Sequence, residues 1–122
     1  MKRLEGKVAI ITGASRGIGE AIALAYSAEG AKVVATARTT KAIVDLVAKL
    51  GEKGTEALAV SADLSIEVDI HRIPTETLAR FGRIDILVNN AAIVHQRIAL
   101  VDFETELWRQ VVEVNLIAPA LL

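Results

Sequence analysis

The sequence alternates between two kinds of apolar pattern, and this alternation limits the chain to a small set of folds. A continuous apolar run at residues 8–11 and largely apolar runs at 33–36, 57–60 and 84–88 are typical of strands that are buried on both faces. After each run, apolar residues recur every three or four positions, as on one face of a helix. Strands joined by helical crossovers pair in parallel, and right-handed crossovers place helices on both faces of the sheet. The sequence therefore predicts an α/β fold with a doubly wound parallel sheet.

Glycines and prolines mark the boundaries of the predicted helices. Gly30 stands where the first helix, from Ile18 onward, would have its C-cap, and Gly51 closes the second helix. Pro74 lies inside the third helix, where its missing N–H predicts a kink. The apolar stripe of the last helix consists of Leu107, Val111, Val114, Ala118 and Leu121.

Composition and charge exclude several classes of protein. The chain has 122 residues, of which 52% are apolar and 3% aromatic, so we expect a single core of aliphatic side chains. The net charge is −1 and no run of like charges occurs, so neither nucleic acid nor an anionic membrane is an expected partner. The first apolar run is too short for a signal peptide or a membrane span. A cytoplasmic protein is the expectation.

Metal and thiol chemistry are not expected. There is no cysteine, and the two histidines, His71 and His95, are far apart in the sequence. His95 follows the fourth predicted strand, where a solvated loop residue is the ordinary interpretation. We therefore predict no metal site.

The connection between the first strand and the first helix carries three glycines. The segment at residues 12–19 reads Thr-Gly-Ala-Ser-Arg-Gly-Ile-Gly. Glycines here permit a tight turn and let backbone N–H groups approach a pyrophosphate, while the helix N-terminus adds partial positive charge. The spacing differs from the common dinucleotide fingerprint, and a flexible turn is the alternative. The position between strand and helix favours a phosphate-binding loop, with these candidate contacts: Gly13, Ser15, Arg16, Gly17, Ile18 and Gly19.

The second strand ends at Ala37-Arg38, about twenty residues beyond the loop, where an NAD site usually carries an Asp or Glu for the ribose. No carboxylate is present there. Arg38 and Arg16 offer guanidinium donors that suit a 2′-phosphate, although each could be a solvated surface arginine. Their joint placement predicts NADP(H) in preference to NAD(H).

Together these motifs resemble the short-chain dehydrogenase/reductase family, in its form with the Thr-Gly-x3-Gly-x-Gly loop. Asp63-Leu64, after the third strand, resembles the family's adenine contact, and residues 89–92, Asn-Asn-Ala-Ala, resemble its Asn-Asn-Ala-Gly motif. The resemblance covers the whole chain and implies a Rossmann-like sheet of about four strands in the order 3-2-1-4, with about four helices in three layers. It adds Asp63, Leu64, Asn90, Ala91 and Ala92 to the candidate cofactor contacts. A helix cap at Asp63 and turn asparagines are the alternatives.

Val114-Asn115-Leu116 resembles the family segment whose Asn supports a proton relay through a water held by its carbonyl. Pro119 has no N–H to donate to the carbonyl of Asn115, so this carbonyl is expected to stay free, with a local kink. An ordinary kinked helix is the alternative.

The remaining catalytic residues of the family, a Ser and a Tyr four residues before a Lys, are expected beyond residue 122. The single tyrosine, Tyr26, lies on the apolar stripe of the first helix and is predicted to pack in the core. The resemblance implies an oxidoreductase that transfers a hydride between NADP(H) and a carbonyl or alcohol substrate. Residues 1–122 would be its NADP(H)-binding, incomplete domain, inactive alone. The alternative is a non-catalytic nucleotide-binding or assembling fragment that self-associates through the last helix or the edge of the fourth strand.

Overall fold

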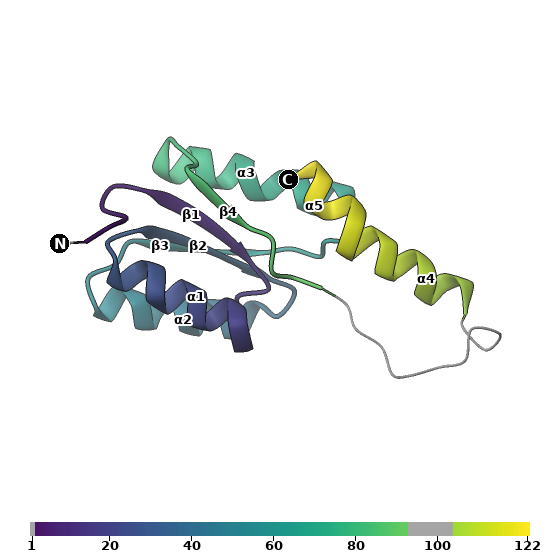
Figure 1. The fold of residues 1–122 in the computed structure, drawn as a ribbon, viewed down its shortest axis with the longest axis horizontal. Helices are drawn as coiled ribbons and strands as arrows, with labels where there is room; N and C mark the ends of the chain where they lie inside the picture. Colours follow the sequence, from purple (N-terminus) through teal and green to yellow (C-terminus); the bar gives the residue numbers. More distant parts are fainter. Residues whose placement is uncertain (1, 93–103) are drawn as a thin grey trace.

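The computed structural model describes residues 2–92 and 104–122 (Figure 1). Its helices and strands alternate as the sequence predicts. The elements, in chain order, are β1 (Val8–Thr12), α1 (Gly17–Ala28), β2 (Lys32–Ala37), α2 (Thr40–Glu52), β3 (Ala57–Ser61), α3 (Glu67–Phe81), β4 (Ile86–Val88), α4 (Thr105–Val112), the π-helical turn η2 (Glu113–Ile117) and α5 (Ala118–Leu121).

The four strands form one parallel sheet in the order β3-β2-β1-β4, which confirms the predicted order. In the centre of the sheet, Ile10 of β1 pairs with Val34 of β2 on one side and with Leu87 of β4 on the other. All five residues of β1 are buried, as expected for a strand that has neighbours on both edges and helices on both faces.

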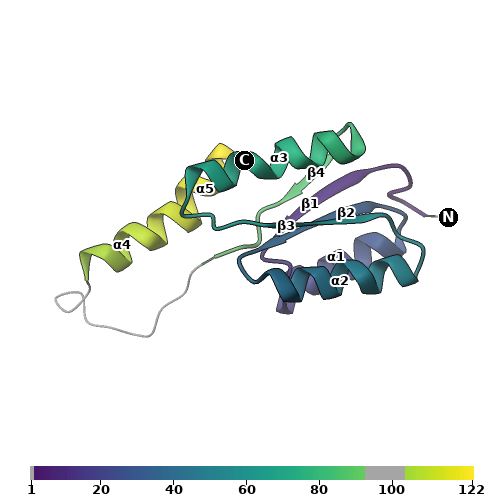
Figure 2. The same ribbon diagram turned by 180° about the vertical axis from the view of Figure 1, so that it is seen from behind.

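Helices cover both faces of the sheet and make three layers. In Figure 1, α1 and α2 lie below the sheet and α3 lies above it beside α5; Figure 2 shows the same layers from behind. Side chains alternate along β1, so Ile10 packs toward Ile70 and Ile73 of α3, whereas Ile11 packs toward the opposite layer with Ile43. Tyr26 of α1 packs against this second core, as the sequence predicts.

Two boundaries differ from the predictions. The second helix does not close at Gly51 but continues to Glu52, and the turn after it is made by Gly54, whose φ is 84°. The third helix runs from Glu67 to Phe81 with Pro74 inside it, as the sequence predicts. The fourth strand starts at Ile86, two residues later than its apolar run.

The last helical segment contains a π-helical turn between α4 and α5. The N–H of Ala118 donates to the carbonyl of Glu113, five residues back, instead of the usual four. Pro119, one residue further on, has no N–H to continue the regular pattern, so the structure accommodates it by widening one turn. Val114 and Ala118 are buried on the α3 side. None of the helices in the described part of the chain has the length and hydrophobicity that crossing a membrane requires.

Candidate cofactor-binding site

A cavity of about 670 Å³ opens at the carboxyl ends of the strands. This edge is where open α/β sheets bind their ligands, because the loops that follow successive strands converge there. Every residue predicted to contact the cofactor lines the cavity except Gly19. The lining residues are Gly13, Ser15, Arg16, Gly17, Ile18, Thr36, Ala37, Arg38, Thr39, Ala42, Ala62, Asp63, Leu64, Ser65, Asn90, Ala91, Ala92, Gln110 and Val114.

The loop between β1 and α1 brings glycine backbone to the cavity wall, together with Ser15, Arg16 and Ile18. Gly17 has a φ of 60°, and a Cβ built on it would meet no atom within 4 Å. Arg16, the N-cap residue of α1, makes no side-chain hydrogen bond to the first helical turn. The N–H groups of that turn therefore keep their capacity to bind an anion at the positive end of the helix. This open, uncapped turn fits a pyrophosphate group.

Gly19 has a different role, because it lies against protein instead of the cavity. A Cβ at Gly19 would overlap the carbonyl oxygen of Gly13 and come within 2.6 Å of Asn90 Nδ2. Asn90 Nδ2 donates to that same carbonyl at 3.2 Å. The absence of a side chain at Gly19 thus lets α1 pack on the loop and on the segment after β4.

Thr12 joins the ends of β1 and β4, a role that the sequence analysis did not assign to it. Its buried hydroxyl donates to the carbonyl of Val88 at 3.3 Å, and accepts from the N–H groups of Asn90 at 3.0 Å and Ala91 at 2.9 Å. A hydroxyl offers one donor and two acceptor lone pairs, so these three bonds use all of its capacity. The signal in the sequence was a Thr at the end of an otherwise apolar buried strand.

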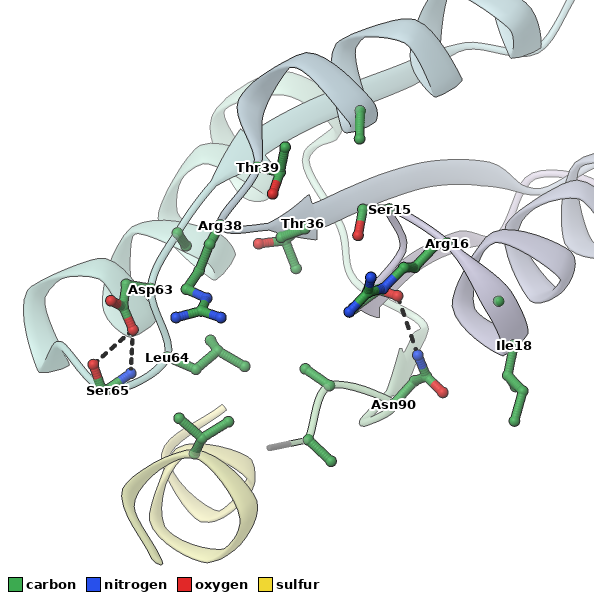
Figure 3. A pocket seen from close by; sticks show the side chains of 18 of the residues that line it. Ser15, Arg16, Ile18, Thr36, Arg38, Thr39, Asp63, Leu64, Ser65 and Asn90 are labelled. Carbon is green, nitrogen blue, oxygen red and sulfur yellow. Dashed lines mark hydrogen bonds between the residues drawn. The ribbon is translucent and has the colours of Figure 1, made fainter. Parts of the chain in front are cut away.

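The two predicted arginines enter the cavity from different elements. In Figure 3, Arg16 extends from the phosphate loop, and Arg38 extends from the end of β2 toward Asp63 and Leu64. Ala37 precedes Arg38 on the cavity wall, so no carboxylate occupies the last position of β2. The cavity therefore has a guanidinium at its phosphate-loop end and another at its β2–β3 end, where Asp63 also lies.

Asp63 is held in its ionised form at the end of β3. Its Oδ1 accepts from Ser65 Oγ at 2.6 Å and from Ser65 N–H at 2.9 Å (Figure 3). The Ser65 hydroxyl, the Ser65 N–H and the charge of Arg38 lower the pKa of Asp63, against the opposing effect of burial. The carboxylate is consequently an acceptor at neutral pH, with Oδ1 already occupied by Ser65.

The helical segment α4–η2 closes the cavity beside Leu64, through Gln110 and Val114. Neither residue was a site candidate from the sequence, because Val114 belongs to the predicted apolar stripe and a polar residue such as Gln110 is usually solvated on an amphipathic helix. Asn115 lies in the π-helical turn next to Val114 but does not line the cavity. The structure therefore brings the cofactor candidates together and leaves Asn115 at the margin.

Two further observations concern the remaining polar groups. Thr36 Oγ1 is buried at the cavity wall and has no hydrogen-bond partner among the described residues. Within residues 2–92 and 104–122, no group of His, Asp and Glu side chains is arranged to hold a metal ion. His95 lies outside the described residues.

Comparison with known proteins identifies the family. Residues 7–122 match the model of the short chain dehydrogenase family, and the chain belongs to this family. An uncharacterised oxidoreductase of Methylorubrum extorquens is 40% identical over 122 residues, which cover 99% of this chain and 49% of the relative. The chain spans about half the length of the curated relatives that it matches.

Solved structures of the family share the fold closely. A metagenomic short-chain oxidoreductase in complex with NADP has a TM-score of 0.92 and 41% identity, with 98% of this chain and 54% of that chain covered. A 3-ketoacyl-(acyl-carrier-protein) reductase from Brucella melitensis, complexed with NADH, has a TM-score of 0.89 and 41% identity. The match covers 97% of this chain and 48% of that chain. Neighbours with either dinucleotide therefore share this half of the fold.

Proposed function

We propose that residues 1–122 form the NADP(H)-binding part, an incomplete domain, of a cytoplasmic short-chain oxidoreductase. The observation that carries the choice of NADP(H) is the pair Ala37-Arg38 at the end of β2. Arg38 brings a guanidinium to the cavity wall directly after β2, and the last residue of β2 is Ala37 instead of a ribose-binding carboxylate, which supports binding of a 2′-phosphate. A charge-assisted contact of this kind favours the phosphorylated dinucleotide over NAD(H).

The other lining residues have complementary roles in this proposal. The first-turn N–H groups of α1 and the backbone of Gly17 hold the pyrophosphate, and Arg16 adds positive charge beside it. Arg38 pairs with the 2′-phosphate, while Asp63 and Leu64 receive the adenine. Asn90 and Ala91, fixed by Thr12, continue the cavity wall toward the nicotinamide half.

The bound nicotinamide would donate a hydride to a carbonyl, which is reduced to an alcohol, or accept a hydride from an alcohol, which is oxidised to a carbonyl. The residues of this chain position the dinucleotide, and Asn115 supports a proton relay in the complete enzyme. A proton donor must lie within hydrogen-bond reach of the reacting oxygen. The family's Ser, Tyr and Lys would provide this donor from beyond residue 122, so residues 1–122 alone bind the cofactor without catalysing hydride transfer.

Calorimetric titration of a mass-verified 122-residue chain with NADP+ and NAD+ tests this proposal. We expect preferential NADP+ binding, and a loss of about tenfold or more in NADP+ affinity in Arg38→Ala, since bonds to charged groups contribute about 1.5–3 kcal/mol. Arg109→Ala, an exposed position on α4 outside the cavity, is the matched control. Equal binding of the two dinucleotides would favour a nucleotide-binding scaffold that ignores the 2′-phosphate. Cofactor-stoichiometric turnover by this chain would disprove its inactivity.

A second proposed function, as an assembling fragment, is supported by an apolar surface on the last helical segment. Trp108, Val112 and Leu116 follow one another at intervals of one turn and are 47%, 36% and 67% exposed. The edge of β4 that faces away from β1 is a second possible contact, because β4 pairs only with β1 within the described sheet.

Sedimentation velocity at micromolar concentration tests this second function. We expect self-association that Leu116→Glu abolishes. Val68→Glu, at an apolar residue of α3 that is 70% exposed, is the control and should leave the association unchanged. A monomer in the unmodified chain would remove the support for assembly.

A further inference from the structure

One hydroxyl ties the turn that carries Arg38 to the neighbouring strand. Arg38 directly follows β2, and α2 begins two residues later at Thr40. Ser61, the last residue of β3, pairs with Ala37 of β2. Its Oγ accepts a hydrogen bond from Thr40 Oγ1 at 2.9 Å and donates one to the backbone carbonyl of Arg38 at 3.3 Å. A single side chain therefore joins both ends of this short turn to β3.

Ser61 is in turn held by α3, on the face of the sheet opposite α2 (Figures 1 and 2). The backbone carbonyl of Ser61 accepts from Arg72 Nη1 at 3.2 Å, and the same nitrogen donates to Asp69 Oδ1 at 3.2 Å. The other carboxylate oxygen of Asp69 accepts from the N–H of Asp63 at 2.8 Å. Hydrogen bonds thus continue from the turn after β2, through the end of β3, to α3.

Ser61 does not line the cavity, so its hydroxyl can influence a bound dinucleotide only through a neighbour. Arg38 is that neighbour, because its side chain extends from the end of β2 into the cavity, toward Asp63 and Leu64 (Figure 3). A planar guanidinium binds a phosphate most strongly when two of its N–H groups face two oxygens. A long side chain keeps that orientation only when its supporting contacts are fixed, and the bond from Ser61 fixes the backbone from which Arg38 starts.

We propose that Ser61 is a positioning residue for Arg38, whose hydroxyl holds the turn after β2 so that the guanidinium meets the 2′-phosphate of NADP(H). This inference rests on the function proposed above, in which Arg38 pairs with that phosphate. It divides the choice of cofactor between two strands: Arg38, after β2, supplies the charge, and Ser61, at the end of β3, supplies the geometry. NAD(H) has no 2′-phosphate, so its affinity does not depend on Ser61.

Calorimetric titration of Ser61→Ala with NADP+ and NAD+ tests the proposal. We expect NADP+ affinity to fall about three- to tenfold, as for one lost hydrogen bond, with less than about a twofold change for NAD+. Ser61→Thr keeps the hydroxyl on a residue that suits a strand, and it should retain the preference for NADP+.

Ser27→Ala is the matched control, because it is the same substitution at a residue outside the cavity. The Ser27 hydroxyl bonds to that of Thr55 at 2.6 Å. This variant should leave the ratio of the two dissociation constants unchanged even where it lowers the free energy of unfolding. A hydroxyl that acts on stability alone would behave in the same way at Ser61.

The double variant Ser61→Ala/Arg38→Ala shows whether Ser61 acts through Arg38. Once the guanidinium is absent, removing the hydroxyl should change NADP+ affinity by less than about twofold, because the two effects are coupled. Equal losses for NADP+ and NAD+ in Ser61→Ala, no loss for either, or a full additional loss in the double variant would overturn the role of Ser61. The proposed function would survive those results, since its own test is Arg38→Ala alone. An unmodified chain that binds NADP+ no better than NAD+ would overturn both.

Discussion

The hydroxyl of Thr12 accepts a hydrogen bond from the backbone N–H of Asn90 at 3.0 Å. This contact joins residues that are 78 positions apart in the sequence, and it fixes the segment after β4 to the last residue of β1. Because Asn90 also donates from its side chain to the carbonyl of Gly13, the phosphate loop and the β4 segment are held as one unit. The shape of the cavity at this point depends on that connection.

Thr12→Val should lower the free energy of unfolding by about 2 kcal/mol, because an isosteric apolar side chain leaves buried backbone groups without their partner. Urea denaturation followed by circular dichroism measures this. Thr12→Ser keeps the hydroxyl and is the control. This variant should keep most of the stability that Thr12→Val loses, and it should keep the NADP+ affinity of the unmodified chain. A Ser variant as unstable as the Val variant would show that the methyl group of Thr12, and not its hydroxyl, is what stabilises this junction.

Gly19→Ala should destabilise the chain by about 1–3 kcal/mol, since overpacking forces backbone or side-chain shifts. The added Cβ would meet the carbonyl of Gly13 and the side chain of Asn90. NADP+ affinity should fall as well, because both contacts border the phosphate loop. Thermal denaturation and calorimetry measure the two effects.

Gly51→Ala provides the matched control for Gly19→Ala. Gly51 lies within α2, and a Cβ there would meet no atom within 4 Å. Ala is favoured over Gly in a helix by about 1 kcal/mol, so this variant should be more stable than the unmodified chain. If both alanine variants were more stable than the unmodified chain, the segments around Gly19 would be able to move apart for a Cβ, and the predicted destabilisation of Gly19→Ala would be wrong.

Asp85 makes the stability depend on pH in the acidic range. Its carboxylate accepts from Arg83 at 2.6 and 2.8 Å and from the N–H of Val8 at 2.9 Å. The side-chain bonds from Arg83, followed by the Val8 N–H, lower the pKa of Asp85 in the folded chain. The unfolded state therefore binds the proton more readily, and the stabilisation is present above the unfolded pKa of about 3.9 and is lost as the pH falls through the folded value.

We expect Asp85→Asn to be less stable at neutral pH and to show a weaker loss of stability below about pH 4, where an unperturbed Asp titrates. Urea denaturation between neutral and acidic pH tests this. Asp45→Asn, at an exposed position on α2, should follow the pH profile of the unmodified chain. Parallel profiles for Asp85→Asn and the unmodified chain would contradict a role for Asp85 in the acid response.

The order of the elements could be predicted from the sequence because it depends on local periodicity. Each strand lies in a largely apolar run, as β1 does from Val8 to Ile11, and each helix carries its own apolar stripe. The phosphate loop could also be predicted from a local signal, since its glycines lie close together in the sequence between β1 and α1. The arginines were found because the end of β2 could be located from the apolar run before it.

Contacts between distant segments could not be predicted in the same way. The partners of Thr12 lie after β4, and no local pattern specifies which carbonyl or N–H a buried hydroxyl will meet. Pro119 predicted a disturbance near Asn115, but not that Ala118 would donate to Glu113 and widen the turn. Gln110 was not identified because its exposure to the cavity follows from how α4 packs beside Leu64.

The identity of residue 37 should determine which dinucleotide the cavity prefers. Ala37 is the last residue of β2 and lines the cavity next to Arg38. In Ala37→Asp, a carboxylate would accept hydrogen bonds from an unphosphorylated ribose and repel a 2′-phosphate. We therefore expect weaker NADP+ binding and stronger NAD+ binding in this variant.

Combining Ala37→Asp with Arg38→Ala should complete the reversal, because the double variant has the ribose acceptor and lacks the guanidinium. Calorimetry on the two single variants and the double variant gives the coupling free energy between the two positions. The effects of the two substitutions on binding free energy should not add, because neighbouring residues that share a ligand group are coupled. Ala42→Asp also places a carboxylate on the cavity wall, on α2, and is the control for charge alone. The same change in preference from Ala42→Asp would mean that net charge, and not the position at the end of β2, selects the cofactor.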